Sequence, residues 1–593
     1  MAFLREMRRK DRDGKFYSYW VVVKTYREKR TKKVKHKILQ SLGRLSGKEV
    51  RDLRLLWQMK ELGEDVIVTK WEKIKVGDSY DFLTMLVCDY LYKMWELDKV
   101  LKNDKSLTEQ VWKIAEILVI NRVIFPNSDY KVSSWYKTTF LDKLLKVKAS
   151  VVNPSRIYRT LDTIYEKTLQ IQQHLADRII SLGFDDFSLV LYDITSSYFE
   201  NNRCPIVKFG LSREKRKDKP QVLLALCVTK EGFPFYWEVL PGDIHDSTTV
   251  KGTISDVKEK FNIEKVCLVM DKGMVNEMNL KEIERSGFYY IVTIGSNIFR
   301  NLSSFPGDIL SDISKEIEKE GKKEFPDYQN VMKKFPCFSF HSKRAYFYLL
   351  EGNENYRYIL CFNPEKFIEE RKQREEKISS IERYFTQYNK ELLKARKTRN
   401  KKTIEYQLYS YLKKRQSLNL FTIHLVPHRI KKNKTSIITT YQIRYKINLK
   451  KLNLLKMTDG TYCIKTNLPQ QHNEYFIVSS YRQRRKVESS FHYLKGFVEI
   501  RPFYHQKEER IKGHITVCIL AYLIQITTEY LLKKAGINIS FQEFISKIQQ
   551  KRAVDLEIEN IRKKDVKLPV LSQNIKKLLS AIGINNENGL FEK

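Results

Sequence analysis

The sequence predicts an α/β fold with a mixed sheet whose core is interrupted by a long insertion. Between residues 183 and 297, apolar strand patterns and helical patterns follow one another in the order β-β-β-α-β-α-β. Three meandering strands followed by crossover units are typical of a mixed sheet with helices on its faces. The composition then changes over residues 298–475, and a helical pattern returns at residue 476.

The composition limits the classes of protein to consider. The chain has 593 residues, of which 42% are hydrophobic, so a mainly disordered chain is excluded. Its net charge of +38, from 109 Lys and Arg against 71 Asp and Glu, favours a polyanionic partner, although charge alone does not separate DNA, RNA and an anionic membrane. Eight scattered Cys without a C-x-x-C pair argue against a disulfide framework or a structural zinc site.

Nothing in the sequence predicts a membrane segment or a secretory signal. The N-terminus runs directly into basic residues, and the most apolar run, 515–524, is too short to span a bilayer and is expected to be a buried helix. We therefore expect a cytoplasmic protein without membrane binding.

The first 182 residues are expected to form two domains that bind DNA. Residues 1–60 form a basic module in which 16–23 is a strand after a turn at 11–14, and 33–42 is a second strand or the start of a helix. The first 50 residues contain 16 Lys and Arg against 5 Asp and Glu, so this β-hairpin is a DNA contact or a solvated edge with equal weight. Residues 61–182 show helical periodicity, broken at Pro126 and Pro154.

The remaining elements follow in order. The first part of the core, 183–297, has expected strands at 187–193, 221–228, 234–240, 265–270 and 288–294, with helices at about 248–261 and 277–285. The insertion, 298–475, is β-rich and contains a helical hairpin at about 364–417 with a basic tip at 394–402. Residues 476–535 complete the core, and 536–593 are expected to be a helical tail.

Three acidic residues stand where a metal-dependent phosphodiester chemistry needs them. Asp193 and Asp271 each end an expected strand, and on neighbouring strands both carboxylates would lie at one edge of the sheet. For each residue alone, a capping or turn role is the competing interpretation. The third acid, Glu488, lies on an expected helix where Tyr481, Arg484, Glu488 and Lys495 fall within an arc of about 60°. A solvated charged helix is the alternative there.

The spacing Y-x2-R-x3-E-x6-K, formed by Tyr481, Arg484, Glu488 and Lys495, resembles the signature of the insertion-sequence transposases often called IS-four-like. These belong to the DDE class, which has an RNase H-like catalytic core, and the β-rich insertion before the glutamate helix is also similar to theirs. Asp193 and Asp271 resemble the family's first two acids. The basic segment 10–45 and the blocks 501–505 and 510–515 resemble parts of the longer members. Lys272, where Arg is common, and Asp243, where Asn is usual, depart from the pattern outside the three acids.

The resemblance implies metal-dependent strand cleavage and strand transfer at the ends of a mobile element. Asp193, Asp271 and Glu488 would bind two Mg²⁺ ions, for which Mn²⁺ may substitute, because carboxylates suit this metal. Tyr481, Arg484 and Lys495 would hold the terminal DNA phosphates, and the adjacent Arg485 and Lys486 rank below them. The implied partners are double-stranded terminal inverted repeats, target DNA and a second copy of the chain in a synaptic homodimer, within a prokaryotic cytoplasm at the nucleoid.

Two rival functions stay open, and other candidate residues rank lower. One rival is a catalytically silent, transposase-derived DNA-binding regulator, and the other is an RNase H-like nuclease acting on RNA or branched DNA. His245 and Asp246 could bind a metal, but residues 246–248 are expected to cap the next helix. His505 and His514 are expected to be satisfied core or surface histidines.

Overall fold

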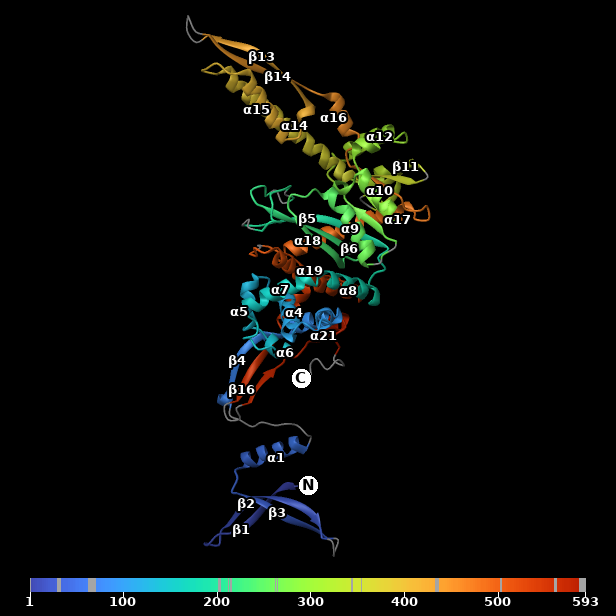
Figure 1. The fold of residues 1–593 in the computed structure, drawn as a ribbon. Helices are drawn as coiled ribbons and strands as arrows, with labels where there is room; N and C mark the ends of the chain where they lie inside the picture. The colour runs from blue at the N-terminus through green and yellow to red at the C-terminus, as the bar shows by residue number, and fades with distance from the viewer. Residues whose placement is uncertain are drawn as a thin grey trace. The chain divides into compact units, whose positions relative to one another are not determined.

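The computed structural model describes residues 2–28, 33–61, 71–200, 204–211, 213, 216–261, 263, 265–342, 345–353, 355–431, 437–501, 504–558 and 563–585 (Figure 1). The chain divides into two compact units. The first comprises Met1–Tyr80 with Arg552–Pro569, and the second comprises Asp81–Lys551 with Val570–Lys593.

The first unit begins with a three-stranded antiparallel sheet in the order β1 (Ala2–Lys10), β2 (Phe16–Arg27) and β3 (Val34–Gly43). The sequence predicted a hairpin, and β1 is the additional strand. Asp11 builds the first turn, since its Oδ1 accepts the backbone N–H groups of Asp13 and Lys15 at 3.1 and 2.7 Å, and Gly14 takes a φ of +78°. Helix α1 (Gly47–Glu61) follows, with Ser46 and Glu49 accepting each other's backbone N–H groups at its start.

A second sheet of the first unit corrects the expected domain contents. Strand β4 (Ile74–Asp81), preceded by the 3₁₀ turn η1 (Trp71–Lys73), lies beside β16 (Arg552–Ile558), which pairs with β17 (Lys563–Lys567). The Tyr80 hydroxyl donates to Asp555 Oδ2 at 2.9 Å across this sheet. The expectation of a helical tail over 536–593 is therefore wrong in part, because β16 lies beside a strand some 475 residues earlier in the chain and β17 pairs with β16.

The second unit contains a helical layer built around one buried helix. Helix α19 (Glu508–Lys534) packs against α2 (Phe82–Met94), α4 (Glu109–Ile124) and α7 (Pro154–Glu166) and also contacts β7 of the large sheet (Figure 1). Trp95 and Trp237 donate their indole N–H groups to Thr527 and Thr516 of α19 at 2.9 and 3.2 Å. The other helices of this layer are α3 (Leu97–Lys102), η2 (Asp129–Lys131), α5 (Val132–Tyr136), α6 (Leu141–Leu145) and α8 (Thr168–Ser181).

Helix α19 is long and apolar enough to cross a membrane by length and composition, but 83% of its most apolar window is buried inside the protein. The expected core helix at 515–524 is thus the middle of a longer buried helix. Helices α20 (Phe541–Gln549) and α21 (Gln573–Ala581) complete this region.

The large sheet contains the predicted core. Strands β5 (Leu189–Tyr198), β6 (Gln221–Thr229) and β7 (Pro234–Pro241) form an antiparallel meander, and β8 (Cys267–Met270) and β9 (Tyr289–Ile294) add in parallel beside β5. Helices α9 (Asp246–Phe261) and α10 (Glu277–Arg285), with the turn η3 (Lys272–Met274), make the crossovers. The predicted order β-β-β-α-β-α-β is confirmed, and the spatial order is β7-β6-β5-β8-β9.

The insertion extends this same sheet. Strand β15 (Thr461–Thr466) pairs antiparallel with β9, and β12 (Tyr356–Phe362), β11 (Ala345–Asn353) and β10 (Ser339–Ser342) follow, which gives nine strands in the described part of the chain. The insertion also contains helices α11 (Ser296–Phe299), α12 (Gly307–Glu320), α13 (Tyr328–Met332) and α16 (Leu449–Lys456). The sequence predicted a β-rich insertion but not the continuity of its strands with the core.

Two helices and a hairpin share a separate hydrophobic cluster, which we call the insertion arm. It consists of α14 (Pro364–Leu393), α15 (Lys401–Lys414), η4 (Leu418–Leu420), β13 (Phe421–Lys431) and β14 (Ile437–Ile447). The expected basic tip is the connection between the two helices. The apolar stripe through Ile381, Phe385 and Leu408 packs with Phe421 and Ile443 of the hairpin, so the helices are not an isolated coiled coil.

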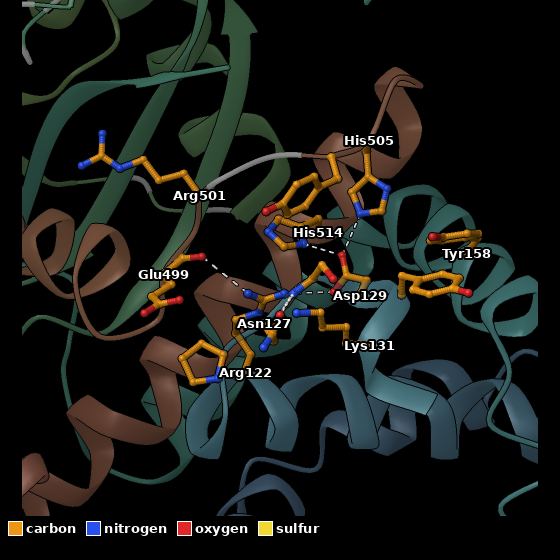
Figure 2. Close-up of a pocket in the computed structure, with 13 residues that line it drawn as sticks. Arg122, Asn127, Asp129, Lys131, Tyr158, Glu499, Arg501, His505 and His514 are labelled. Atoms are coloured by element: carbon orange, nitrogen blue, oxygen red, sulfur yellow. Dashed lines mark hydrogen bonds and ion pairs between the residues drawn. The ribbon is translucent and has the colours of Figure 1, made fainter. Parts of the chain in front are cut away.

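Asp129 connects the helical layer to the segment before α19 (Figure 2). Its Oδ1 accepts from Arg122 at 3.0 Å, and its Oδ2 accepts from His505 Nε2 and His514 Nδ1, both at 2.7 Å. The Arg122 and Asp129 side chains are each only 3% exposed. His505 and His514 are therefore satisfied structural histidines, as the sequence analysis expected.

Electrostatics hold this cluster in its charged form. Burial raises the pKa of Asp129, but His514, His505 and Arg122 together lower it by more. The net pKa therefore lies well below the usual range. Burial lowers the pKa of His514, whereas Cys518 and the Asp129 carboxylate raise it, and the net shift is upward to about 10. The His514 Nε2 also lies 3.2 Å from the Ile500 carbonyl oxygen, so both ring nitrogens face acceptors.

We expect Gly513→Ala to lower the free energy of unfolding by about 1–3 kcal/mol, because its Cβ would lie 2.2 Å from the Leu161 carbonyl oxygen where α19 meets α7. Gly252→Ala in α9 is the matched control: no atom lies within 4 Å of its Cβ, and helix propensity predicts a gain of about 0.5–1 kcal/mol. Urea unfolding of both variants measures the difference. Equal effects would show that the close approach of α19 and α7 is not needed for stability.

We expect Asp129→Ala to lower the free energy of unfolding by about 3–5 kcal/mol, since it leaves Arg122 and His514 buried without their shared carboxylate. Asp162→Ala breaks the more exposed pair with Arg510 and should cost no more than about 1 kcal/mol. Thermal and urea unfolding compare the two. A loss for Asp129→Ala as small as that of the control would contradict the account of a buried, charged cluster.

Candidate active site

The pairing of two neighbouring strands sets the positions of the first two acids. Strands β5 and β8 are parallel, and their last paired residues are Leu191 and Val269. Asp193 lies two residues further along β5, and Asp271 lies two residues further along the chain, directly after the end of β8, so the register brings both acids to the same end of this strand pair. Each acid is an even number of residues from the last paired position, so both side chains lie on the same face of the sheet.

Asp193 does not end its strand, which corrects one expectation. Strand β5 continues to Tyr198, with Asp193 opposite Leu226 of β6 on its other side. Only the pairing with β8 stops before Asp193. Asp271 does follow the end of β8, where its Oδ1 accepts the backbone N–H of Lys272 at 2.8 Å.

The glutamate comes from a helix that is broken at one residue of the motif. Helix α17 (Glu474–Gln483) ends before Arg484, and α18 (Arg485–Lys495) begins after it, whereas the sequence predicted one helix. The Arg484 N–H donates to the Tyr481 carbonyl at 3.1 Å, and the Val487 N–H donates to the Arg484 carbonyl at the same distance. These i to i+3 hydrogen bonds tighten the turn between the two helices.

Packing directs the polar face of α18 toward the acids. Val487, Ser490, Phe491 and Leu494 are the buried residues of α18, which packs against β5 and β6. Glu488 lies beside this buried face, and its side chain is 47% exposed. The amphipathic pattern of the helix thus brings an acid from a distant part of the chain to the sheet edge.

Arg484 connects two of the three acids. Its guanidinium lies 3.4 Å from Asp271 Oδ2 and 2.7 Å from Glu488 Oε1. Burial lowers the pKa of Arg484, but Tyr481 and the two carboxylates raise it, and the net shift is upward. Asp271 and Glu488 therefore share one cation, which compensates the repulsion between them.

Asp193 is electrostatically distinct from its neighbours. Burial raises its pKa to about 6, although the Ile194 N–H, which donates to its Oδ1 at 2.8 Å, and the nearby Arg213 and Arg484 lower it. A carboxyl group with a raised pKa beside other acids is typical of sites that bind cations or transfer protons.

The other motif residues lie around these acids at different depths. Tyr481 is half-buried, and its hydroxyl donates to Thr293 Oγ1 of β9 at 3.3 Å. Lys495 donates to Thr195 Oγ1 at 2.6 Å, two residues beyond Asp193 on β5. The Arg484 guanidinium lies 5.8 Å from the centre of the Tyr481 ring.

A cavity of about 620 Å³ opens beside Asp271 and Glu488, and neither Asp193 nor Lys495 is among the residues that line it. Of the predicted residues, Asp271, Tyr481, Arg484, Arg485 and Glu488 line it. Lys486 lines two other surface cavities, so it is not brought to the acids.

Three basic residues of this cavity were missed by the sequence analysis. Arg482 lies within the motif segment, and Lys366 and Arg374 come from α14 of the insertion arm. Lys366 carries no signal in the sequence, because its place depends on how the insertion packs.

The remaining candidates do not join the acids. Asp243 accepts from Lys208 at 3.2 Å on the surface, and helix α9 begins at Asp246, whose side chain lies outside the described residues. Among the described residues, Asp129, His505 and His514 form a group whose ligand atoms lie close enough to hold a metal ion. Their 2.7 Å distances are those of hydrogen bonds, and the adjacent Arg122 disfavours a cation there.

Two family profiles match this chain. The profile of the IS1634 family transposase, N-terminal domain, matches residues 4–65, and that of the transposase DDE domain matches residues 208–524, which include Asp271 and Glu488 but not Asp193. The search of curated proteins found no similar sequence. A solved piggyBac transposase synaptic complex with hairpin DNA is similar at a TM-score of 0.33 and 10% identity over 79% of each chain. Because the DDE profile covers more than half of the chain, the protein belongs to the DDE transposase family and acts as a DNA transposase.

Proposed function

We propose that this transposase cleaves and transfers DNA strands at the ends of an insertion sequence, with Asp193, Asp271 and Glu488 as its catalytic carboxylates. The observation that carries the proposal is the register of β5 and β8, which brings two acids to the same end of this strand pair, together with the ion pairs that join Arg484 to Asp271 and Glu488. Convergent carboxylates on a basic protein suit chemistry on a polyanionic phosphodiester.

DDE transposases use divalent metals, and we propose that these three residues hold two Mg²⁺ ions, for which Mn²⁺ can substitute. The donor set fits, because it offers only carboxylate oxygens, the ligands that Mg²⁺ prefers. When bound, the ions would activate the attacking oxygen and stabilise the leaving oxygen of the phosphodiester. The Arg484 guanidinium also supplies positive charge to Asp271 and Glu488.

The basic residues of the motif would hold the DNA backbone. We propose that Arg484 releases Asp271 and Glu488 and binds a terminal phosphate instead, since the planar guanidinium donates to carboxylates and phosphates in the same way. Lys495, beside Thr195, would hold a neighbouring phosphate, and Tyr481 would contact the same strand. Arg485 at the cavity rim extends this surface, whereas Lys486 lines other cavities and would contact DNA only outside it.

The finer assignments also belong to this proposal. The signature formed by Tyr481, Arg484, Glu488 and Lys495 supports membership of the IS-four-like transposases, with terminal inverted repeats and target DNA as partners. A synaptic homodimer and a cytoplasmic, nucleoid-associated location are part of the same assignment. The basic N-terminal module, the helical region and the tip of the insertion arm would supply further DNA contacts.

A catalytically silent DNA-binding derivative is the second candidate. The match to the transposase DDE profile begins at residue 208 and so leaves out Asp193, and Arg484 pairs with the other two acids, so a metal bound there would have to displace these pairs. The two candidates differ in whether a divalent metal displaces those pairs and permits cleavage.

We expect Glu488→Gln to reduce metal-dependent cleavage of DNA that carries the element's ends by about 100-fold or more while binding is retained, because the amide removes the metal-binding charge but keeps the size. Gel assays of cleavage and binding with Mg²⁺ measure both. Glu543→Gln, on the surface of α20, is the matched control and should cleave like the wild type.

Two results would contradict this assignment in different ways. Cleavage by Glu488→Gln at the wild-type rate would remove Glu488 from the site. Binding without cleavage by the wild type, under any divalent metal, would favour the silent derivative.

We expect Mg²⁺ affinity to fall as the pH falls through about 6, because the Asp193 carboxyl then holds a proton that competes with the metal. Well below that pH the loss should approach about tenfold per pH unit. Isothermal titration calorimetry on either side of pH 6 measures it, with Asp193→Asn as the comparison. A pH dependence that Asp193→Asn leaves unchanged would assign the proton to another group.

A further inference from the structure

The insertion arm divides its charges unevenly between its first helix and the rest. Helix α14 carries seven Lys and Arg against seven Glu. The remainder of the arm, residues 394–447, carries 15 Lys and Arg against a single acid, Glu405. The net charge of the arm therefore comes from α15, the connection before it and the hairpin of β13 and β14. Such an excess of positive charge favours a polyanionic partner.

These cations have few ionic partners within the protein. Among the residues that the structure describes in 394–447, only Lys401 makes an ion pair, at 3.8 Å from Glu405, and both side chains are more than half exposed. The Arg415 guanidinium lies over the Tyr411 ring. The other cations described there make no ion pair, so an external anion that binds them breaks none.

The hairpin carries its cations on the side that faces away from the helices. Phe421 and Ile443 pack with α14 and α15 in the hydrophobic cluster of the arm (Figure 1). The alternate residues point outward: His424 lies directly opposite Arg444 in the ladder, and Lys446 is the next outward residue of β14, all three being exposed. Alternation along the strands thus separates an apolar inner face from a basic outer face.

The outer face passes to the other set of alternate residues toward the far end of the hairpin, and the cations change with it. Thr440 belongs to the same set as Arg444 but is fully buried, and its hydroxyl donates to the Leu392 carbonyl at 2.9 Å. Arg429 and Lys431 belong to the other set, and they are exposed. Because two-stranded ribbons twist strongly, one continuous outer surface crosses from one set to the other. The cations follow that surface along the ribbon.

The connection between α14 and α15 joins the same surface. The Arg399 N–H donates to the Thr439 carbonyl at 2.9 Å, and Thr439 lies opposite Arg429 in the ladder. Lys397 and Arg399 are exposed. Two basic stretches that are distant in the sequence therefore lie together at the far end of the arm.

We propose that this outer surface, which we call the basic face, binds the backbone of duplex DNA without regard to its sequence. The basic face consists of Lys397, Arg399, Arg429, Lys431, Arg444 and Lys446. The 11 residues of β13 span about 36 Å, which is about one turn of duplex DNA. Exposed Lys and Arg that no partner holds in place suit phosphates, whereas the reading of base edges needs side chains in fixed positions.

DNA of arbitrary sequence is what a transposase meets as its target, so we assign the basic face to target DNA. Helix α14 begins beside the catalytic cavity, which Lys366 and Arg374 line, and it ends shortly before Arg399. Its 30 residues span about 45 Å, so one helix joins the cavity to the basic face. The assignment to target DNA rests on the proposed strand transfer, whereas the binding of duplex DNA does not.

The test is a binding assay with the full chain and a duplex of random sequence, without divalent metal, so that binding is measured apart from cleavage. One variant combines Lys431→Gln, Arg444→Gln and Lys446→Gln. Its affinity should fall about tenfold or more, and the slope of log affinity against log salt should fall by about 2–3, since each lost phosphate contact removes about 0.9. A duplex that carries the element's ends should lose as much, because its phosphates are the same.

The matched control combines Lys372→Gln, Arg383→Gln and Lys390→Gln, which remove the same charges from exposed positions of α14. It should keep the affinity and the salt slope of the wild type. A third variant exchanges Lys for Arg and Arg for Lys at positions 431, 444 and 446. It should also bind like the wild type, which separates a loss of charge from a loss of folding.

Strand transfer tests the assignment to target DNA. With cleaved ends in excess, the variant without the three cations should need about tenfold more target DNA for half-maximal transfer, in line with its loss of affinity. An unchanged requirement would overturn that assignment. If the wild type transfers no strands but the binding of random DNA falls as expected, the proposed strand transfer fails and the DNA contact stands.

Three binding results would overturn the DNA contact itself. Equal weakening in the variant and the matched control would show that binding follows net charge alone. A loss confined to DNA that carries the element's ends would show that the arm reads sequence. Weaker binding of double-stranded RNA or of anionic lipid vesicles, with the binding of duplex DNA unchanged, would assign the basic face to another polyanion.

Discussion

The parallel pairing of β5 with β8 is the constraint on which the candidate site depends. Its register brings Asp193 and Asp271 to the same end of the strand pair, and the fully buried strand β8 leaves little freedom to alter that register, because a shift of one residue would turn every side chain to the other face. The third acid arrives through a different force, the burial of the apolar face of α18 against β5 and β6. Strand pairing positions two of the carboxylates and side-chain packing positions the third, so both are needed to bring the three together.

Like charges brought together in this way require compensation, and the chain supplies it from within the same motif. Arg484 stands at the break between α17 and α18, where the tightened turn directs its side chain between Asp271 and Glu488. Asp193 receives no such ion pair among the described contacts and is instead more easily protonated, since burial raises its pKa. The negative charge of the site is thus compensated in two ways. Asp271 and Glu488 pair with Arg484, and Asp193 takes up a proton more easily than an ordinary Asp.

Much of the core and the acids could be predicted from the sequence, because strand order, apolar runs and motif spacing are local signals. Features that depend on distant partners could not. Strand β1 is rich in Arg and Lys and has no strand pattern of its own, and β16 and β17 become strands only beside β4. Neither Gly nor Pro stands within α17 or α18, so the break at Arg484 reflects tertiary packing. Lys366 and the Asp129 cluster likewise join residues that only the fold brings together.

The continuity of the nine-stranded sheet has a consequence for how such an insertion is acquired or removed. Strand β15 forms its ladder with β9, and β9 is in turn the neighbour of β8, whose end carries Asp271. Cutting out the whole insertion would therefore expose a bare strand edge one position away from the catalytic sheet strands, and such edges promote aggregation. The helices and hairpin of the insertion arm have their own hydrophobic cluster and interrupt no ladder of that sheet. The arm can therefore change in length without removing a strand from the catalytic sheet, whereas the insertion's own strands cannot be removed without leaving β9 as an edge.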